Sequence, residues 1–203
     1  MKQLTTLLAS VSFLTLAACV DTTGLSATSS RTAHPNTDPN AAVTVVEFAD
    51  LQCPACQSAH EQIVKPLIAK YGTRIRYDFM HFPIQTLHPY ALIAAQASEC
   101  AADQGKFWEF LDLNYQNQDQ LNKTVIYTWA QTLGLDSNLF SRCVKSGIKK
   151  DGIIDEYQNA KTLGVTGTPT FFVNGVKIPS EQTSLTGIST VIDQALQTAT
   201  QRL

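Results

Sequence analysis

Two cysteines separated by two residues are the feature of this sequence best suited to chemistry. Cys53 and Cys56, in the stretch QCPACQ, follow an apolar β-branched run and precede a stretch with helical spacing. The start of a helix carries unpaired backbone N–H groups and the positive end of the helix dipole, so a cysteine there ionises easily. We therefore expect Cys53 to be the attacking sulfur of a redox-active pair. Cys56, about one turn further along, would be the more sheltered sulfur that resolves mixed disulfides.

A metal site is the alternative for this cysteine pair. A structural zinc site needs two further ligands at close spacing, and only His60 lies near, one helical turn after Cys56. Copper held by the two thiolates and a histidine stays open, because soft sulfur ligands select copper. The sequence has no second CxxC and no closely spaced histidine pair. It therefore favours dithiol redox chemistry, with no metal and no cofactor.

The cysteines lie where a predicted strand meets a predicted helix. Residues 43–49 form a nearly continuous apolar run, typical of a strand buried on both faces, and residues 53–71 have helical spacing with Pro66 as a kink. Residues 75–81 alternate as a second strand. In open α/β folds, active sites lie at the junction of a strand with the following helix.

The remaining elements predict an α/β domain with a helical insertion. Residues 89–146 have helical spacing without strand signals, and a further helix is predicted at 150–163. Two short strands then flank Asn174-Gly175, a strong hairpin signal, and a last helix covers about 187–197. The length and the ordinary composition fit one domain with one core.

Two carboxyl groups lie close to the cysteines in the sequence. Glu47 falls inside the first predicted strand, and a buried carboxyl group costs several kcal/mol unless it titrates or finds a partner. It could lie beneath the helix and relay a proton to or from Cys56; alternatively, it points to solvent at the margin of the sheet. Asp50 lies on the turn, where we expect it to be exposed.

The first residues have the pattern of an export signal. Lys2 precedes an apolar stretch at residues 4–18 that is short for a membrane span, and LAAC at residues 16–19 resembles the lipobox of bacterial lipoproteins. We expect residues 1–18 to be a lipoprotein signal peptide and Cys19 to become the lipidated N-terminus. Ordinary signal-peptidase cleavage nearby, which leaves Cys19 as a free thiol, is the alternative.

The next segment is polar, and it separates the signal from the folded part. Residues 19–40 are rich in Thr, Ser, Asn, Asp and Pro, and bury too few apolar groups to offset the entropy of ordering, so we expect a flexible tether. The folded domain is then expected at residues 41–203, with the helical insertion at about 88–150.

The remaining two cysteines form an even pair in a protein that we expect to be exported. Cys100 and Cys143 both lie in predicted helices of the insertion, 43 positions apart. Exported proteins meet an oxidising environment, so we expect a structural disulfide between them. Two free buried thiols are the alternative.

The charge of the chain excludes some classes of partner. With 15 basic and 17 acidic residues the formal net charge is −2, which offers no concentrated positive patch for nucleic acid or for an anionic membrane surface. Partners must be recognised by shape or by chemistry.

The order of these elements resembles a known family. Strand, CxxC, helix, strand, helical segment, helix, Gly-Thr-Pro-Thr, hairpin and helix are similar to the DsbA-like thiol-disulfide oxidoreductases. The matching pieces are VEFADLQCPAC, AAQASECAADQGKFWEFLD and GVTGTPTFFVNG, and together they span about residues 42–200. The resemblance implies an α/β, thioredoxin-like fold with an inserted helical domain.

The resemblance also implies roles for individual residues. The sulfurs of Cys53 and Cys56 would exchange disulfides with other proteins. Pro169 would be a cis-proline packed beside them, and Thr168 would bind the extended backbone of a substrate. The acid in the first strand of the family matches Glu47.

We therefore expect an extracytoplasmic enzyme, a monomer anchored by lipid to a bacterial membrane and facing the periplasm in a Gram-negative cell. It would introduce disulfides into exported proteins, and a membrane or soluble redox partner would recycle it. Pro54-Ala55 supplies no cation beside Cys53, so we expect a less oxidising protein than the strongest members of the family. A disulfide reductase or isomerase, a copper-handling protein and a binding module without exchange activity are the alternatives.

Overall fold

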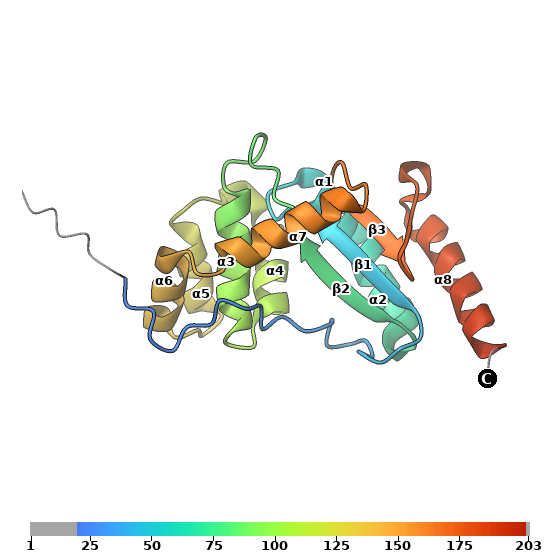
Figure 1. Ribbon diagram of the computed structural model, residues 1–203, viewed down its shortest axis with the longest axis horizontal. Helices are drawn as coiled ribbons and strands as arrows, with labels where there is room; N and C mark the ends of the chain where they lie inside the picture. Colours follow the sequence, from blue (N-terminus) through green and yellow to red (C-terminus); the bar gives the residue numbers. More distant parts are fainter. Residues whose placement is uncertain (1–19, 202–203) are drawn as a thin grey trace, which may run out of the picture.

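The computed structural model describes residues 20–201, and its centre is a four-stranded mixed sheet in the order β2-β1-β3-β4. The first strand runs parallel to the second and antiparallel to the third. Figure 1 shows the strands side by side between two groups of helices. Their bounds are β1 (Thr44–Ala49), β2 (Arg76–His81), β3 (Thr170–Val173) and β4 (Val176–Lys177). The thioredoxin-like α/β fold expected from the sequence is confirmed.

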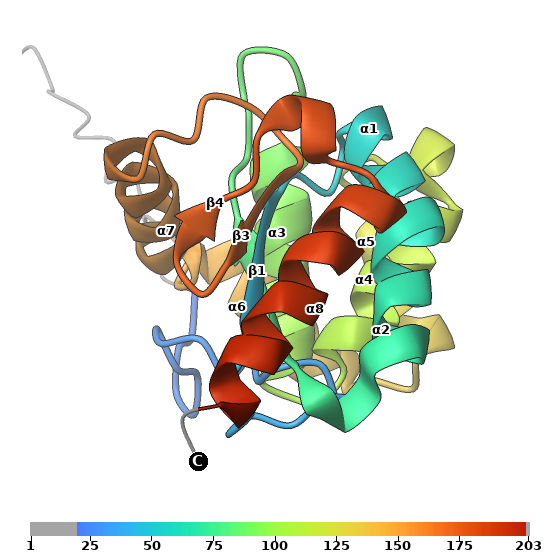
Figure 2. The same ribbon diagram turned by 90° about the vertical axis from the view of Figure 1, so that its right-hand side faces the viewer.

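Helices cover the two faces of this sheet unequally. Figure 2 shows α2 (Lys65–Tyr71) and α8 (Leu185–Thr200) side by side on one face, and α7 (Lys150–Thr162) on the other. Successive side chains of a strand point to opposite faces, so β1 contributes to both. Val45 packs into the larger core, while Phe48 packs with Phe172 in a smaller cluster.

The helical insertion lies beside the sheet. It comprises α3 (Ala91–Ala102), α4 (Phe107–Gln116), α5 (Val125–Thr132) and α6 (Ser137–Ser146), with a 3-10 turn at Gln118–Gln120. Large apolar side chains of the insertion, such as Phe110 and Phe140, belong to the same core cluster as Val45 and Leu67. Sheet and insertion therefore share one core. The expected disulfide between Cys100 and Cys143 is present, and it joins α3 to α6.

The helix after the cysteines differs from the expectation of one helix with a kink. It consists of α1 (Pro54–Ala59), a π-helical stretch (His60–Val64) and α2, in which Pro66 lies in the first turn. The N–H of Lys65 reaches back to the carbonyl of His60, five residues earlier. A proline in a first turn costs no hydrogen bond, so the wide turn places Pro66 where its missing N–H is harmless.

The hairpin between β3 and β4 follows the sequence signal. Asn174 and Gly175 both have positive φ angles, of 49° and 77°. Two consecutive residues in the left-handed region form the turn that matches the twist of a hairpin. A 3-10 turn (Ser180–Gln182) then leads into α8, and another (Gly72–Arg74) connects α2 to β2.

The expectation of a flexible tether is wrong for the part of it that the structure describes. Residues 20–40, here called the strap, cross from the α6 end of the insertion to the sheet (Figure 1). The N–H of His34 donates to the carbonyl of Tyr77 at 2.9 Å, and the N–H of Asp38 donates to the carbonyl of Ile75 at 3.0 Å. The strap is therefore part of the fold. The signal-peptide prediction and Cys19 lie outside the described residues.

A buried arginine fixes the middle of the strap. Arg31 lies 2.6 Å from Glu99 of α3 and 2.5 Å from Glu156 of α7. Burial alone would raise the pKa of Glu99, but a hydrogen bond from His81 and the charge of Arg31 outweigh it and lower that pKa to about 2. The composition of the strap could not show this, because its ordering depends on ion pairs with distant residues instead of on apolar burial.

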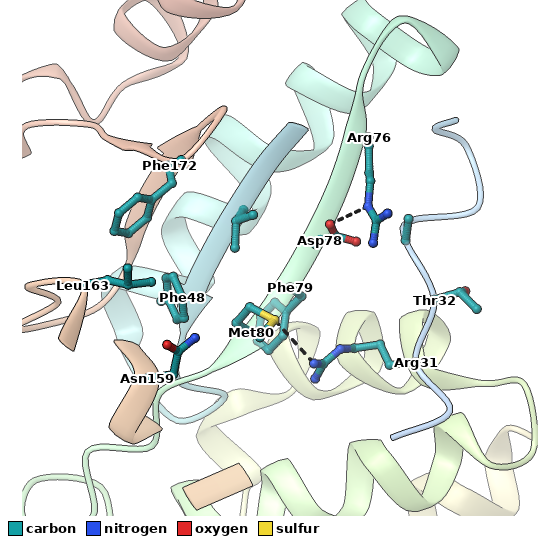
Figure 3. A pocket seen from close by; sticks show the side chains of 13 residues that line it. Arg31, Thr32, Phe48, Arg76, Asp78, Phe79, Met80, Asn159, Leu163 and Phe172 are labelled. Atoms are coloured by element: carbon teal, nitrogen blue, oxygen red, sulfur yellow. Dashed lines mark hydrogen bonds and ion pairs between the residues drawn. The ribbon is translucent and has the colours of Figure 1, made fainter. Parts of the chain in front are cut away.

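The strap also borders a cavity on the less covered face of the sheet. This cavity has a volume of about 410 Å³ and lies between the strap, the strands and α7. Figure 3 shows Arg31 beside Met80, and Arg76 paired with Asp78 at the rim. Phe48 lines it, so it lies on the opposite face of β1 from the larger core.

Within residues 20–201, no helix is long and apolar enough to cross a membrane.

Replacing Arg31 tests the anchoring of the strap. Arg31→Ala leaves the buried Glu99 and the partly buried Glu156 without their cation, and we expect it to lower the free energy of unfolding by about 3–5 kcal/mol in urea titrations. Arg142→Ala is the matched control, because Arg142 pairs with Asp21 of the strap at the exposed surface and should change stability little. Equal effects of the two changes would contradict the anchoring role of Arg31.

Candidate active site

The two cysteines of the CxxC stretch lie at the start of the helix, as the sequence predicts. Cys53 is the N-cap of α1, with Pro54 in the first turn. Its sulfur lies 3.6 Å from the carbonyl oxygen of Thr168, and the residue is 7% exposed. Cys56 is fully buried, and its sulfur accepts a hydrogen bond of 3.5 Å from the N–H of Asp50. Neither cysteine forms a disulfide in this structure.

The surroundings of the two sulfurs give them opposite acidities. A hydrogen bond from the Cys56 thiol is the main cause that lowers the pKa of Cys53 from 9.0 to about 5. Burial opposes this shift, and the backbone N–H groups of Cys56 and Ala55 add to it. Burial, the hydrogen bond to Cys53 and the nearby Glu47 raise the pKa of Cys56 well above its usual value. At neutral pH the pair is a Cys53 thiolate and a Cys56 thiol.

A pH titration of the reduced protein checks this asymmetry. The ultraviolet absorbance of the thiolate should rise in one step with a midpoint near pH 5, and this step should disappear in Cys53→Ser. Because the Cys56 thiol stays protonated, it should add absorbance only at alkaline pH. A first midpoint near pH 9 would show that neither the Cys56 thiol nor the backbone N–H groups at the helix start stabilise the Cys53 thiolate.

Glu47 lies inside the protein, so the solvent-facing alternative is excluded. It is 1% exposed, and its neighbours across the sheet are Phe79 and Phe171. The hydroxyl of Tyr77 donates to one carboxylate oxygen, while the other, Oε1, has no hydrogen-bond partner among the described residues. Burial raises the pKa of Glu47 to about 7, although Tyr77 and His60 act in the opposite direction. The carboxyl group can therefore gain or lose a proton near neutral pH.

The raised pKa of Glu47 makes a prediction about stability. The folded-state pKa of Glu47 lies above its unfolded value. The contribution of this carboxyl group to the free energy of unfolding is therefore fully present below about pH 4.5 and is lost as the pH rises toward 7. At about 1.4 kcal/mol per unit, the loss is about 3 kcal/mol. Urea titrations from pH 4 to 8 should show it, in a background with serine at both positions 53 and 56. Glu47→Gln should remove this dependence, and parallel curves for the two proteins would contradict the shift.

Asp50 is buried, so the expectation of an exposed side chain is wrong. Its carboxylate accepts the N–H of Gln52 at 2.7 Å and the N–H of Ile84 at 2.8 Å, and lies 2.8 Å from Nδ1 of His88. These contacts join the turn after β1 to the loop after β2. The bond to Gln52 is a local turn contact of the kind that Asp favours, whereas the two distant partners leave no local signal.

The insertion also holds the active-site turn, through residues that the sequence analysis missed. The side chain of Asn114 donates to the carbonyl of Leu51 at 2.7 Å. Gln118 donates to the same carbonyl at 3.0 Å and to the carbonyl of Cys53 at 3.1 Å. Gln118 belongs to a polar stretch that has the composition of a connection between helices. Its role depends on contacts with residues more than 60 positions away.

The loop before β3 lies opposite the cysteines. The peptide bond between Thr168 and Pro169 is cis, as the resemblance implies. A groove of about 770 Å³ lies between α1, this loop and residues 177–183. The hydroxyl of Thr168 is buried without a hydrogen-bond partner in the described structure. Residues of α1 and of the cis-proline loop therefore line the same groove.

The copper alternative finds little support in the position of the nearby histidine. Nε2 of His60 lies 2.6 Å from Asp112, so this side chain is engaged away from the sulfurs. Within residues 20–201, no group of three or more His, Cys, Asp or Glu side chains is placed to hold a metal ion.

Fold and site together define a thioredoxin-like protein with a dithiol at the start of its first helix. The family model described as thioredoxin matches residues 30–194, and the chain belongs to this family. Two solved structures, both 26% identical, share its fold. Alpha-DsbA1 of Wolbachia pipientis has a TM-score of 0.72 and covers 83% of this chain and 95% of its own. A thioredoxin-like oxidoreductase from Silicibacter pomeroyi DSS-3 has a TM-score of 0.67, with 83% and 93% covered. The resemblance to DsbA-like proteins is confirmed.

A curated relative shares a similar stretch within a much longer chain. The Na(+)/H(+) antiporter NhaA 3 of Salinispora tropica is 42% identical over 142 residues, which cover 70% of this chain and 22% of the antiporter. This chain therefore spans about a fifth of the length of that relative. The match carries no antiporter function over to this chain.

Proposed function

We propose that this protein is an extracytoplasmic thiol-disulfide oxidoreductase that introduces disulfide bonds into exported proteins. The observation that carries the proposal is the asymmetry of the dithiol: a Cys53 thiolate with a pKa of about 5 beside a buried Cys56 thiol. The similar fold of the thioredoxin-like oxidoreductase from Silicibacter pomeroyi DSS-3 supports it.

The reaction begins with the disulfide form of the pair. A thiolate of the client attacks the sulfur of Cys53, and the Cys56 sulfur leaves and takes up a proton, for which the nearby Glu47 is the donor. A second client thiolate attacks the client sulfur of the mixed disulfide, and Cys53 leaves as a thiolate. Two electrons pass from the client to the dithiol, and a redox partner removes them again.

The acidity of Cys53 favours the oxidising direction. A sulfur with a low pKa is a good leaving group, so the mixed disulfide breaks in favour of the oxidised client. A pKa of about 5 lies between about 7 for thioredoxin and about 3.5 for a strong oxidant of the DsbA type. A reductase or isomerase would use the same residues. The direction of exchange therefore depends on the acidity of Cys53.

The groove and the disulfide of the insertion support the remaining parts of the proposal. The groove beside Thr168 and Pro169 offers space for an extended client segment. The bond between Cys100 and Cys143 fits a protein that matures in an oxidising compartment. We propose a monomer that acts outside the cytoplasm, with Cys19 as its lipid anchor.

Exchange assays test the proposed direction. The oxidised protein should reactivate a reduced, unfolded ribonuclease, whereas Cys53→Ser should be inactive. Cys56→Ser should accumulate mixed disulfides with a ribonuclease that already carries disulfides, because its Cys53 thiolate attacks them and no Cys56 resolves the product. Equilibration with glutathione should give a potential between about −270 and −120 mV, the values of thioredoxin and of a strong oxidant. Faster reduction of insulin than oxidation of ribonuclease, with a potential near −270 mV, would favour a reductase instead. A double variant with serine at positions 100 and 143 is the control and should keep exchange activity.

A further inference from the structure

A second group of titratable side chains lies at a separate opening of the protein surface. His34 of the strap, His60, Lys65 and Asp112 of α4 line a cavity of about 450 Å³ that opens to solvent. This cavity is separate from the groove at the cis-proline loop and shares no residue with it. It gives the interior behind the cysteines a second polar opening.

His60 lies between this cavity and the interior. Its side chain is 6% exposed, and its Nε2 atom lies 2.6 Å from Oδ1 of Asp112, whose side chain is 44% exposed. His60 is the first residue of the π-helical stretch, and such stretches occur often at functional sites. Its ring also packs against Tyr115, with the ring centroids 5.0 Å apart. The imidazole is therefore held with one nitrogen toward a solvent-accessible carboxylate.

Tyr77, which is hydrogen-bonded to Glu47, offers no path for the proton of this carboxyl group. The hydroxyl of Tyr77 is bonded to it, but burial and the charge of Glu47 raise the pKa of Tyr77 well above its usual value, so Tyr77 does not release a proton. The Oε1 atom of Glu47 has no partner among the described residues and is free for a further contact. His60 is close enough to lower the pKa of Glu47 by its charge.

We infer that His60 and Asp112 form the route by which protons pass between Glu47 and solvent during disulfide exchange. This inference rests on the proposed function. When Cys56 attacks a mixed disulfide at Cys53, the Cys56 proton moves to Glu47, the Cys53–Cys56 bond forms, and the partner leaves as a thiolate. The proton then passes from Glu47 to the unprotonated Nδ1 atom of the His60 ring, whose other nitrogen faces Asp112. From Nε2 of His60 it passes to Asp112 and the solvent. In client oxidation the proton moves inward along the same path.

Other charged groups around the route set its pH dependence. Lys65 lies 4.0 Å from Asp112 and 2.5 Å from Glu61. On the strap side, burial lowers the pKa of His34, so this ring is mostly neutral. Glu47 itself faces Tyr77 and the two cysteines. His60 is thus the group that joins the interior acid to the exposed Asp112.

The test separates the two steps of the reaction with oxidised glutathione. Reduced protein first forms a mixed disulfide at Cys53, at a rate proportional to glutathione concentration, and Cys56 then resolves it at a concentration-independent rate. Acid quenching and mass spectrometry follow both steps from pH 5 to 9. His60→Ala should slow the second step about tenfold or more and leave the first within about twofold, because only the second needs the Cys56 proton to leave. Asp112→Asn should slow the same step.

Rescue and matched controls distinguish proton transfer from loss of structure. Free imidazole should restore the resolving step in His60→Ala. Glu109→Gln, one turn earlier on α4 and paired with Lys106 at the surface, makes the same charge change as Asp112→Asn and should leave both steps unchanged. In the Glu47→Gln background, His60→Ala should add no further slowing.

Two outcomes overturn the inference without affecting the proposed function. One is a resolving rate in both His60→Ala and Asp112→Asn that equals that of the wild type. The other is slowing of both steps alike in each variant, without rescue by imidazole, which would show a structural role. If the wild type itself forms no mixed disulfide, the proposed function fails instead.

Discussion

The structure depends on one constraint: a carboxyl group has to remain beside a buried sulfur that water does not reach. Glu47 lies in the central strand, bonded to Tyr77, and both it and Cys56 are almost completely buried. Burial makes the charged form of each group costly, so each holds its proton more strongly than in water. Cys53 lies at the start of the helix, where its thiolate is stabilised, so this sulfur loses its proton more easily than in water. This difference between neighbouring sulfurs is the basis on which we propose an oxidising direction for the exchange.

The rest of the fold maintains this arrangement. Asn114 and Gln118 of the insertion hold the carbonyls of the active-site turn, and Asp50 joins that turn to the loop after β2. The strap is anchored by the ion pair between Arg31 and Glu99, and its His34 lines the cavity at His60. A dithiol on a bare sheet and helix would lack the hydrogen bonds from Asn114 and Gln118 to the active-site turn. The insertion and the strap therefore serve the site as well as the core.

The sequence predicts the local parts of this arrangement well. Three local signals correspond to what the structure contains: the apolar strand followed by CxxC, the Asn174-Gly175 turn, and the even pair of remaining cysteines. The expectations for the strap and Asp50 are wrong because their order comes from partners far away in the chain. Polar composition indicates disorder only when the polar groups stay in water. Neither Arg31 nor Asp50 does, and no local pattern encodes the carboxylates and amides that satisfy them.

The most direct test of this account is a titration of the Glu47 carboxyl carbon by NMR in the reduced and in the disulfide form. The account predicts a pKa near 7 in the reduced protein, and a lower one once the disulfide removes the negative charge of Cys53. Such a change would show that the acid senses the redox state of the pair and can carry its proton. A pKa near 4.5 in both forms would show that Glu47 is an ordinary solvated acid, and would contradict the account.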